Sequence, residues 1–308
     1  RPFSPAIRLF RSSLSPFRFA GSLAGALPGG PPHDNAPRFD YSRGGPPGII
    51  DMQLPLHIRV KLIRQDILSA LGLGGNVPVA LAERDGGLVV QVDGREFFVA
   101  SPLRWKLYKK GWNGRLDQLE REYGVGRHVK LGPDSLVLDI GANAGEFAHI
   151  CARYGATVHC FEPDPKVNAC LRQNIAQLNN ATAHDIVIYK EDGEVSFGLA
   201  PDRADSSVIF GDKVPVVKKK AQTVASFCRE NGITRVDFIK CDAEGAEPEV
   251  LEGIGDFFPN ISALALDTGP ERMGERTNKE CAAILAANGF TVIDEKVGKR
   301  CMTYGVKK

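Results

Sequence analysis

The chain has 308 residues, of which 43% are hydrophobic and 25% are charged; these values are ordinary for a folded protein and exclude disorder of the whole chain. No run approaches the roughly 20 consecutive apolar residues that a membrane-spanning helix needs, so a bilayer-spanning protein is excluded. Lys and Arg number 39 against 37 for Asp and Glu, and the net charge of +2 gives no global reason to expect nucleic acid or an anionic membrane as partner.

The seven cysteines are scattered along the chain and include no Cys-x-x-Cys pair. An odd number without a pairing pattern argues against a zinc site and against a disulfide framework. The pattern favours a reducing compartment, in which most of these side chains are small core hydrophobes. We therefore expect a cytoplasmic protein.

Residues 1–48 differ from the rest of the chain. They contain nine of the 20 prolines and six arginines, four of which precede Asp34, the first acidic residue. Pro and Gly at this density sustain neither a helix nor a strand, so the segment is predicted to be a flexible basic tail. An Arg- and Ser-rich, acid-poor stretch is also typical of organelle-targeting segments, which makes the mitochondrial matrix the alternative location.

Residues 49–130 are predicted to form a small α+β accessory region. Apolar residues recur at helical spacing over 58–71, and Gly72 is a natural stop for that helix. An Asp-Gly turn between two apolar runs predicts a β-hairpin over 88–99. A short helix is expected over 116–123. We expect this region to cap the main domain.

An aromatic and basic cluster lies within the accessory region, where Trp105, Tyr108 and Trp112 stand among arginines and lysines. Aromatic faces stack on sugars or bases, and cations bind phosphate, so the cluster is a candidate binding surface. Core packing of the cap is the alternative. The binding-surface interpretation, together with the basic tail, raises the hypothesis of an RNA-directed enzyme.

Residues 131–308 alternate strands and helices. Helices are predicted over 146–154, 166–178 and 277–289. The predicted strands are short apolar runs at 136–140, 157–161, 186–189, 195–199, 236–241, 263–266, 291–294 and 301–306. This alternation predicts an α/β fold with a mostly parallel sheet covered on both faces, and the last two strands are expected to form a terminal antiparallel pair.

The turn after the first of these strands, Asp139 to Gly145, is the first candidate binding element, because ligands of open parallel sheets bind beyond the carboxyl ends of the strands. Gly141 permits a sharp turn that approaches a ligand closely. Asn143 tolerates the left-handed backbone region comparatively well. The helix that begins near Gly145 presents free N–H groups, which suit a carboxylate.

Glu162 follows the second strand and can accept two hydrogen bonds from the ribose hydroxyls of a nucleoside. The unit therefore indicates a nucleoside-cofactor site. Dinucleotide sites have the pattern Gly-x-Gly-x-x-Gly, but Asn143 and Glu146 replace its second and third glycines, and an acid at 146 would repel a diphosphate. Carboxylates such as Asp139 favour a cationic, phosphate-free donor, which S-adenosylmethionine is.

The strongest motif is the segment 237–247 at the end of a later strand, which contains Asp237, Lys240, Asp242, Glu244 and Glu247. At this point the sequence resembles the FkbM-type methyltransferases. Their hallmarks, Val-Leu-Asp-Ile-Gly-Ala-Asn-x-Gly and Asp-x-x-Lys-x-Asp-x-Glu-Gly-x-Glu, stand here at 137–145 and 237–247. The segments 192–197 and 223–227 are also similar to the family's intervening segments. The resemblance covers roughly 135–295.

The resemblance implies a class I methyltransferase (Rossmann-like) fold over 131–308, with a mostly parallel seven-stranded sheet and a terminal antiparallel strand. It also implies transfer of a methyl group from S-adenosylmethionine to a hydroxyl oxygen. The residues that it suggests as donor contacts are Asp139, Gly141, Ala142, Asn143, Gly145, Glu162, Ile186, Val187 and Asp242.

An alcohol acceptor must lose its proton during the transfer, and a carboxylate within hydrogen-bond reach can accept it. Asp242 is the first candidate for this general base and Glu244 the second. In an alternative that we do not favour, Asp242 and Asp267 end neighbouring strands and hold Mg²⁺, which lowers the pKa of the acceptor.

Other polar residues are predicted to be structural. We expect Asp237, Lys240 and Glu247 to form an ion-pair network that fixes the junction of strand and loop. His149 lies in a predicted helix, where a lone histidine is more often a packing residue than a ligand. The lysine run 218–220 is predicted to be a solvated loop.

The sequence thus predicts an S-adenosylmethionine-dependent O-methyltransferase that acts on a sugar, a glycolipid or another small hydroxylated metabolite. Two alternatives stay open. One is an RNA or ribonucleoprotein methyltransferase. The other is a non-catalytic assembly factor on the same fold, because fold and motif do not prove turnover.

Overall fold

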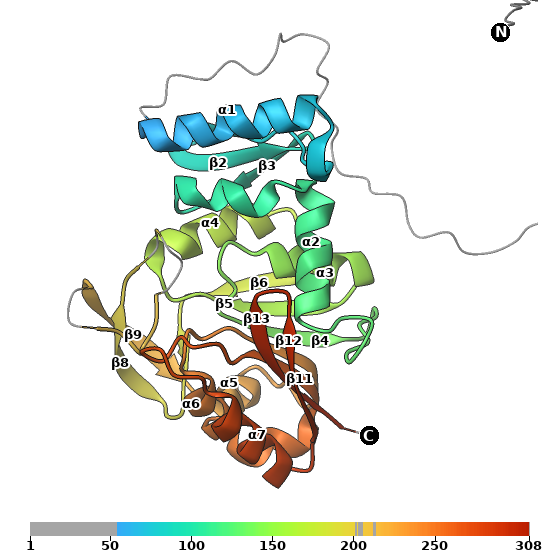
Figure 1. Cartoon of the computed structure of the whole chain (residues 1–308). Helices are drawn as coiled ribbons and strands as arrows, with labels where there is room; N and C mark the ends of the chain where they lie inside the picture. The colour runs from blue at the N-terminus through green and yellow to red at the C-terminus, as the bar shows by residue number, and fades with distance from the viewer. Residues whose placement is uncertain (1–53, 201, 203–205, 212–213, 308) are drawn as a thin grey trace, which may run out of the picture. The chain divides into compact units, whose positions relative to one another are not determined.

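A seven-stranded sheet forms the centre of the main domain (Figure 1). The computed structural model describes residues 54–200, 202, 206–211 and 214–307, all of them within the unit Arg38–Lys308, so the predicted tail over 1–48 lies outside the described residues. The strands of the sheet are β4 (Leu136–Ile140), β5 (Thr157–Phe161), β6 (Ala181–His184), β10 (Val236–Cys241), β11 (Ile261–Asp267), β12 (Thr291–Val297) and β13 (Arg300–Val306).

The order of the strands in this sheet is β12-β13-β11-β10-β4-β5-β6. β4 pairs in parallel with β5 and β10, and the parallel pairing continues to β6 on one side and to β11 on the other. β13 runs antiparallel to both β11 and β12. This order, with one terminal antiparallel pair, confirms the predicted α/β fold of the class I methyltransferase type.

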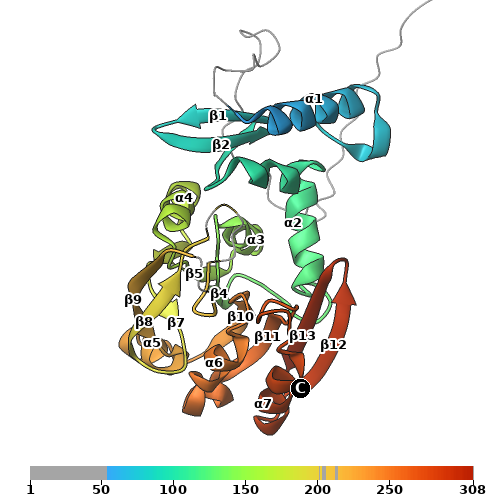
Figure 2. The same cartoon turned by 60° about the vertical axis from the view of Figure 1, so that its left-hand side comes forward.

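Successive residues of a strand point to opposite sides of the sheet, and apolar residues occur on both sides here, so both faces are covered by helices. Val137 packs in one core cluster and Leu138 in the other. The helices on the first face are α2 (Gly111–Glu122), α3 (Glu146–Tyr154) and α4 (Pro165–Ile175), and those on the second are α5 (Val224–Glu230), α6 (Glu247–Glu252), α7 (Asn278–Ala287) and the 3₁₀ turn η4 (Gly255–Asn260) (Figure 2). Among the helices of the described residues, none is long and apolar enough to cross a membrane.

A small three-stranded sheet, separate from the β1-β2-β3 sheet of the accessory region, stands beside the main one and was not predicted. It consists of β7 (Val187–Ile188), β9 (Val216–Gln222) and β8 (Gly193–Gly198), in that order. The strand predicted at 186–189 is therefore β7 in the small sheet, and the third strand of the main sheet is β6. The loop prediction for 218–220 was wrong: these lysines lie in β9, where Lys218 and Lys220 point outward while Val217 packs in the small sheet's own core.

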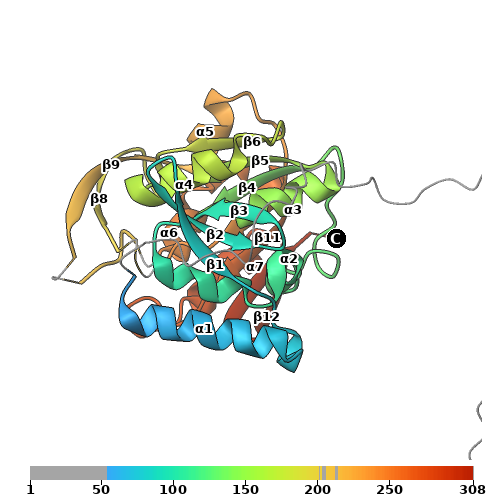
Figure 3. The ribbon, with the colours of Figure 1, turned by 90° about the horizontal axis from the view of Figure 1, so that it is seen from above.

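The accessory region contains the predicted helix and hairpin. Its elements are α1 (Leu56–Ala70), the 3₁₀ turn η2 (Leu73–Gly75), β1 (Ala80–Arg84), β2 (Gly87–Val92), β3 (Arg95–Phe98) and the 3₁₀ helix η3 (Pro102–Tyr108), before α2. α1 lies along the outer side of this region (Figure 3). Only part of its apolar pattern is buried, because Ile58 packs inward while Ile67 is 54% exposed.

The aromatic cluster of the accessory region belongs to the core. Trp105, Tyr108 and Trp112 are at most 5% exposed, and all three pack in the same cluster as residues of α3. Trp112 contacts His149 edge to face, with ring centroids 5.0 Å apart, which agrees with a packing role for that histidine. Core packing is therefore the correct interpretation of this cluster, since no ring face is free to stack on a sugar or base.

All seven cysteines, which fall among the described residues, are free thiols, and five of them are buried. Burial raises the pKa of the Cys228 thiol to about 12, so this side chain stays protonated. The buried cysteines serve as small core residues, as predicted.

Candidate active site

The carboxyl ends of β4, β5, β10 and β11 border a cavity of about 800 Å³. A cavity of this size is within the range of small-molecule sites. Most of the residues singled out from the sequence line it. They lie at or after the ends of four strands of the main sheet, and at the start of the small sheet, so they are far apart in the sequence. They are Gly141, Ala142, Asn143, Glu162, Ile186, Val187, Asp242, Glu244 and Asp267.

The turn after β4 has the backbone conformation that its sequence predicts. Gly141 has φ of 71°, and a Cβ atom placed on it would lie 1.9 Å from the carbonyl oxygen of Asp242. The close approach is thus to the neighbouring strand's loop and not only to a ligand. Asn143 has φ of 51°, and its Oδ1 accepts a hydrogen bond from the backbone N–H of Ala144 at 2.9 Å. The turn is therefore fixed on both sides before any ligand binds.

Glu162 lies directly after β5 and is 7% exposed. Its two carboxylate oxygens accept hydrogen bonds from the backbone N–H groups of Asn143, at 3.0 Å, and Asp164, at 2.9 Å. Burial raises the pKa of this carboxyl to about 7, in spite of those hydrogen bonds. A carboxylate in this position has lone pairs left for hydroxyl groups in the cavity.

Asp242 follows β10 and is held by two groups from distant parts of the chain. The Tyr123 hydroxyl donates a hydrogen bond to its Oδ2 at 2.8 Å, and Nη1 of Arg300 lies 2.8 Å from the same oxygen. Burial alone would raise the pKa of Asp242, but Arg300 and Lys240 outweigh it and lower the pKa to about 2. The carboxylate is therefore ionised throughout the neutral range.

Residues 139–290 match the family model of the methyltransferase FkbM domain. This part of the chain belongs to the FkbM methyltransferase family.

Two curated relatives are similar to part of this chain. The chain is 27% identical over 142 residues to the 2-O-methyltransferase NoeI of Sinorhizobium fredii, a match that covers 39% of this chain and 58% of NoeI. It is also 27% identical over 207 residues to the 31-O-demethyl-FK506 methyltransferase FkbM of Streptomyces tacrolimicus, covering 55% and 78% of the two chains. Among solved structures, a SAM-dependent methyltransferase from Aquifex aeolicus aligns with a TM-score of 0.39 at 16% identity, over 68% of this chain and 95% of that one.

Asp139 and Gly145 of the FkbM domain do not line the cavity. Asp139 is fully buried, and its Oδ1 lies 2.7 Å from Nζ of Lys240, which also donates a hydrogen bond to the carbonyl oxygen of Gly141 at 2.9 Å. A Cβ atom on Gly145 would meet Leu171 at 2.8 Å. Asp139 thus supports the glycine turn through Lys240, and Gly145 allows α3 to pack closely against α4.

The remaining acids of the 237–247 block also hold structure in place. Lys240 forms the predicted ion pair, but its partner is Asp139 and not an acid of the block. Asp237 pairs with Arg235 at 3.0 Å, at the opposite end of β10. Glu247 is buried and accepts hydrogen bonds from two backbone N–H groups of the loop after Asp242. The loop is therefore fixed by hydrogen bonds more than by a network of ion pairs.

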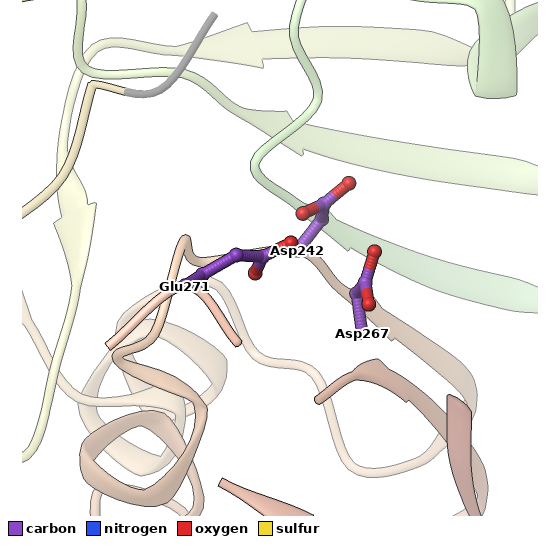
Figure 4. Close-up of side chains that lie close together, drawn as sticks. All are labelled: Asp242, Asp267 and Glu271. Atoms are coloured by element: carbon purple, nitrogen blue, oxygen red, sulfur yellow. The ribbon is translucent and has the colours of Figure 1, made fainter. Parts of the chain in front are cut away.

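A third carboxylate joins Asp242 and Asp267, as Figure 4 shows. Oxygen atoms of Asp242, Asp267 and Glu271 lie within 4.8 Å of one another. Burial raises the pKa of Asp267 to about 6 and that of Glu271 to about 10, with the neighbouring carboxylates adding to both. Arg300 contacts both Asp242 and Asp267, so a cation from the chain already stands between two of the three acids.

Sequence reasoning missed Glu271, Tyr123 and Arg300. Glu271 follows the end of β11 by four residues, so the rule that sites lie beyond strand ends could have found it. The other two carry no local signal, because Tyr123 ends the accessory helix α2 and Arg300 begins β13. Both lie outside the segment that matches the family.

Glu146, in the first turn of α3, is not the free acid that the sequence suggested. It is 3% exposed, accepts a hydrogen bond from the Tyr108 hydroxyl at 3.1 Å, and lies 3.5 Å from Nη2 of Arg115. Burial opposes its ionisation, but Arg115 and Arg104 outweigh it and lower the pKa. Because its charge is compensated, Glu146 is a weaker argument against a diphosphate than the sequence alone implied.

Proposed function

We propose that this chain is an S-adenosylmethionine-dependent O-methyltransferase whose acceptor is a hydroxyl group on a small molecule, such as a sugar or a glycolipid. The observation that carries the proposal is the meeting of three features at one cavity. The glycine turn after β4, Glu162 after β5 and Asp242 after β10 all border it. The names of the two curated relatives, a 2-O-methyltransferase and a methyltransferase of 31-O-demethyl-FK506, support hydroxyl oxygen as the acceptor atom.

The lining residues fit a cationic nucleoside donor. Glu162 accepts hydrogen bonds from ribose hydroxyls, and Ile186 and Val187 provide apolar contacts for the adenine ring. The acidic end of the cavity, at Asp242, suits a positive charge. The donor itself supplies a methyl group on a sulfonium, which is a good leaving group, so alignment and exclusion of water are what the protein adds.

The acids beyond β10 and β11 have different tasks in this proposal. Asp242, with a pKa of about 2, is a weak proton acceptor but a good hydrogen-bond acceptor, so it orients the acceptor hydroxyl. Asp267 has a pKa of about 6, which matches a general base at neutral pH. Glu244 also lines the cavity and remains the alternative base.

A metal ion is not required by the residues present. Asp242, Asp267 and Glu271 offer the oxygen ligands that Mg²⁺ prefers. The guanidinium of Arg300, however, supplies positive charge to two of these three carboxylates. We therefore propose a metal-independent transfer.

The first experiment is calorimetric titration of the purified chain with S-adenosylhomocysteine, the demethylated donor. We expect binding at one site per chain. A chain that does not bind it would support the assembly-factor alternative instead.

The second experiment measures release of S-adenosylhomocysteine from S-adenosylmethionine with a panel of mono- and oligosaccharides and with an RNA mixture, each with and without EDTA. We expect turnover with a hydroxylated small molecule that EDTA does not affect. Loss of turnover with EDTA and its rescue by Mg²⁺ would instead favour the metal-assisted route. Methylation of RNA alone would overturn the acceptor class, although burial of the aromatic cluster removes one of the two sequence arguments for RNA.

A further inference from the structure

The accessory region contributes two arginines to the lining of the cavity, Arg104 and Arg115, and Arg104 is the more exposed of the two. Arg104 lies in η3, lines the cavity, and has a side chain that is 19% exposed. Its Nη2 donates a hydrogen bond to Oδ1 of Asn143 at 3.1 Å and lies 4.0 Å from Oε1 of Glu146. Among the described residues, its hydrogen bond and its ion pair thus both use the same nitrogen.

The charges at this end of the cavity do not balance. Glu146 is the carboxylate that faces the two guanidinium groups of Arg104 and Arg115. Arg115 is the closer of the two, at 3.5 Å, and its side chain is only 7% exposed. One positive charge is therefore in excess where the glycine turn meets the accessory region. Arg104 is the more exposed of the two arginines, so its guanidinium is the one available to a ligand.

The N-terminus of α3, which the sequence suggested as a carboxylate site, is already in use. The carboxylate of Glu146 accepts a hydrogen bond from its own backbone N–H in the first turn of that helix. An incoming carboxylate would therefore meet a negative charge at the helix end and a positive charge at Arg104.

The other cations that line the cavity are committed to carboxylates of the chain or lie elsewhere. Lys240 pairs with Asp139 beneath the turn. Arg300 pairs with Asp242 and Asp267 at the opposite, acidic end. Lys299 is exposed, beside Arg300 and just before β13.

We propose that Arg104 binds the carboxylate of the donor's amino-acid portion, an inference that rests on the function proposed above. Guanidinium groups suit carboxylates because two N–H donors match two oxygens. Asn143 accepts a hydrogen bond from Nη2 and so fixes the guanidinium above the glycine turn. The ribose end of the donor then lies toward Glu162 and the amino-acid end toward Arg104, which orients the molecule along the cavity. Arg104 lies outside the part of the chain that matches the family, so the family match does not assign it.

The test compares two ligands that differ by one group. Calorimetry is run with S-adenosylhomocysteine and with its decarboxylated analogue, against wild type, Arg104→Gln, Arg104→Lys and the control Arg59→Gln on the outer helix α1. We expect Arg104→Gln to weaken S-adenosylhomocysteine binding about 10- to 100-fold, as for loss of a hydrogen bond between charged groups. Binding of the decarboxylated analogue should change less than about threefold. This ligand lacks the carboxylate that Arg104 is proposed to bind, so the substitution removes no contact to it. Arg104→Lys should restore part of the loss, and Arg59→Gln should match wild type.

Equal weakening of both ligands by Arg104→Gln would overturn the assignment and give Arg104 a structural role. Unchanged binding of both ligands would overturn it as well. Thermal unfolding of each variant shows whether the fold is kept. If wild type binds neither ligand, the proposed function itself fails. That result is distinct from equal weakening or unchanged binding in Arg104→Gln, which would overturn only the role of Arg104.

Discussion

Glu162 offers a sharp test of the donor site because its carboxyl titrates in an accessible pH range. Burial raises its pKa to about 7 from an ordinary value of 4.5. Ribose hydroxyls donate hydrogen bonds to a carboxylate, and such bonds are stronger when the acceptor is ionised. We therefore expect the affinity for S-adenosylhomocysteine to rise with pH through this range.

The size of the effect follows from the pKa. If only the ionised form binds, the affinity one pH unit below the pKa is about tenfold weaker than the plateau, which is about 1.4 kcal/mol. Near the pKa, binding should release about half a proton, which calorimetry in buffers of different ionisation enthalpy can count. Glu162→Gln should weaken binding by about 1–3 kcal/mol and remove the pH dependence.

Glu247→Gln is the matched control. Burial also raises the pKa of Glu247 to about 7, but its contacts are to backbone N–H groups and the Thr277 hydroxyl, and it does not line the cavity. This variant should keep the pH dependence of binding. A flat profile in wild type, or a slope that survives in Glu162→Gln, would refute the assignment of Glu162 to the ribose.

The same shift affects stability, with a definite sign. The folded protein holds the Glu162 proton more tightly than the unfolded chain, so this contribution to stability is complete below the unfolded value of 4.5 and is lost as pH rises through about 7. The loss amounts to about 3 kcal/mol for the ligand-free protein. Urea unfolding at several pH values should show wild type losing more stability over this range than Glu162→Gln.

Two further substitutions test the architecture of the site. Asp242→Asn should lower turnover about 100-fold, because the acceptor hydroxyl loses the carboxylate that orients it, while S-adenosylhomocysteine affinity changes far less; equal losses in kinetics and calorimetry would mean that Asp242 only positions the donor. Gly141→Ala should destabilise the fold by at least about 1–3 kcal/mol, because φ is positive and the added Cβ would lie 1.9 Å from the Asp242 carbonyl oxygen. Gly132→Ala, where a Cβ meets nothing within 4 Å, should be nearly neutral in the same unfolding assay, and similar losses in both would contradict the clash.

The strands that sequence reasoning placed correctly are those with continuous apolar runs. β4 and β10 lie in the middle of the sheet with their residues mostly buried, so the pattern of the segment alone indicates a strand. β6 is different, because its four residues, Ala181–His184, are not strongly apolar and form a strand by pairing with β5 at the edge of the sheet. No local pattern could indicate that pairing.

The candidate site divides in the same way. The residues proposed for the donor side, from Gly141 to Glu162, belong to one strand–turn–helix–strand unit, so their spacing in the sequence already fixes their neighbourhood. The groups that control Asp242 do not, since Tyr123 is 119 positions away in the sequence and Arg300 is 58 away. Their positions depend on how the accessory helix and the last hairpin pack on the sheet.

The accessory region and the last hairpin are thus parts of the site. Tyr123 and Arg300 both contact Oδ2 of Asp242. Without Arg300, Asp242 would face Asp267 and Glu271 with one cation fewer, and mutual repulsion would raise the pKa values of all three carboxyls. A fragment limited to the family match would also leave β11 without its partner β13 and expose the edge of the sheet. In this chain the Asp242 carboxylate of the FkbM motif is therefore held by residues that lie before and after the matched segment.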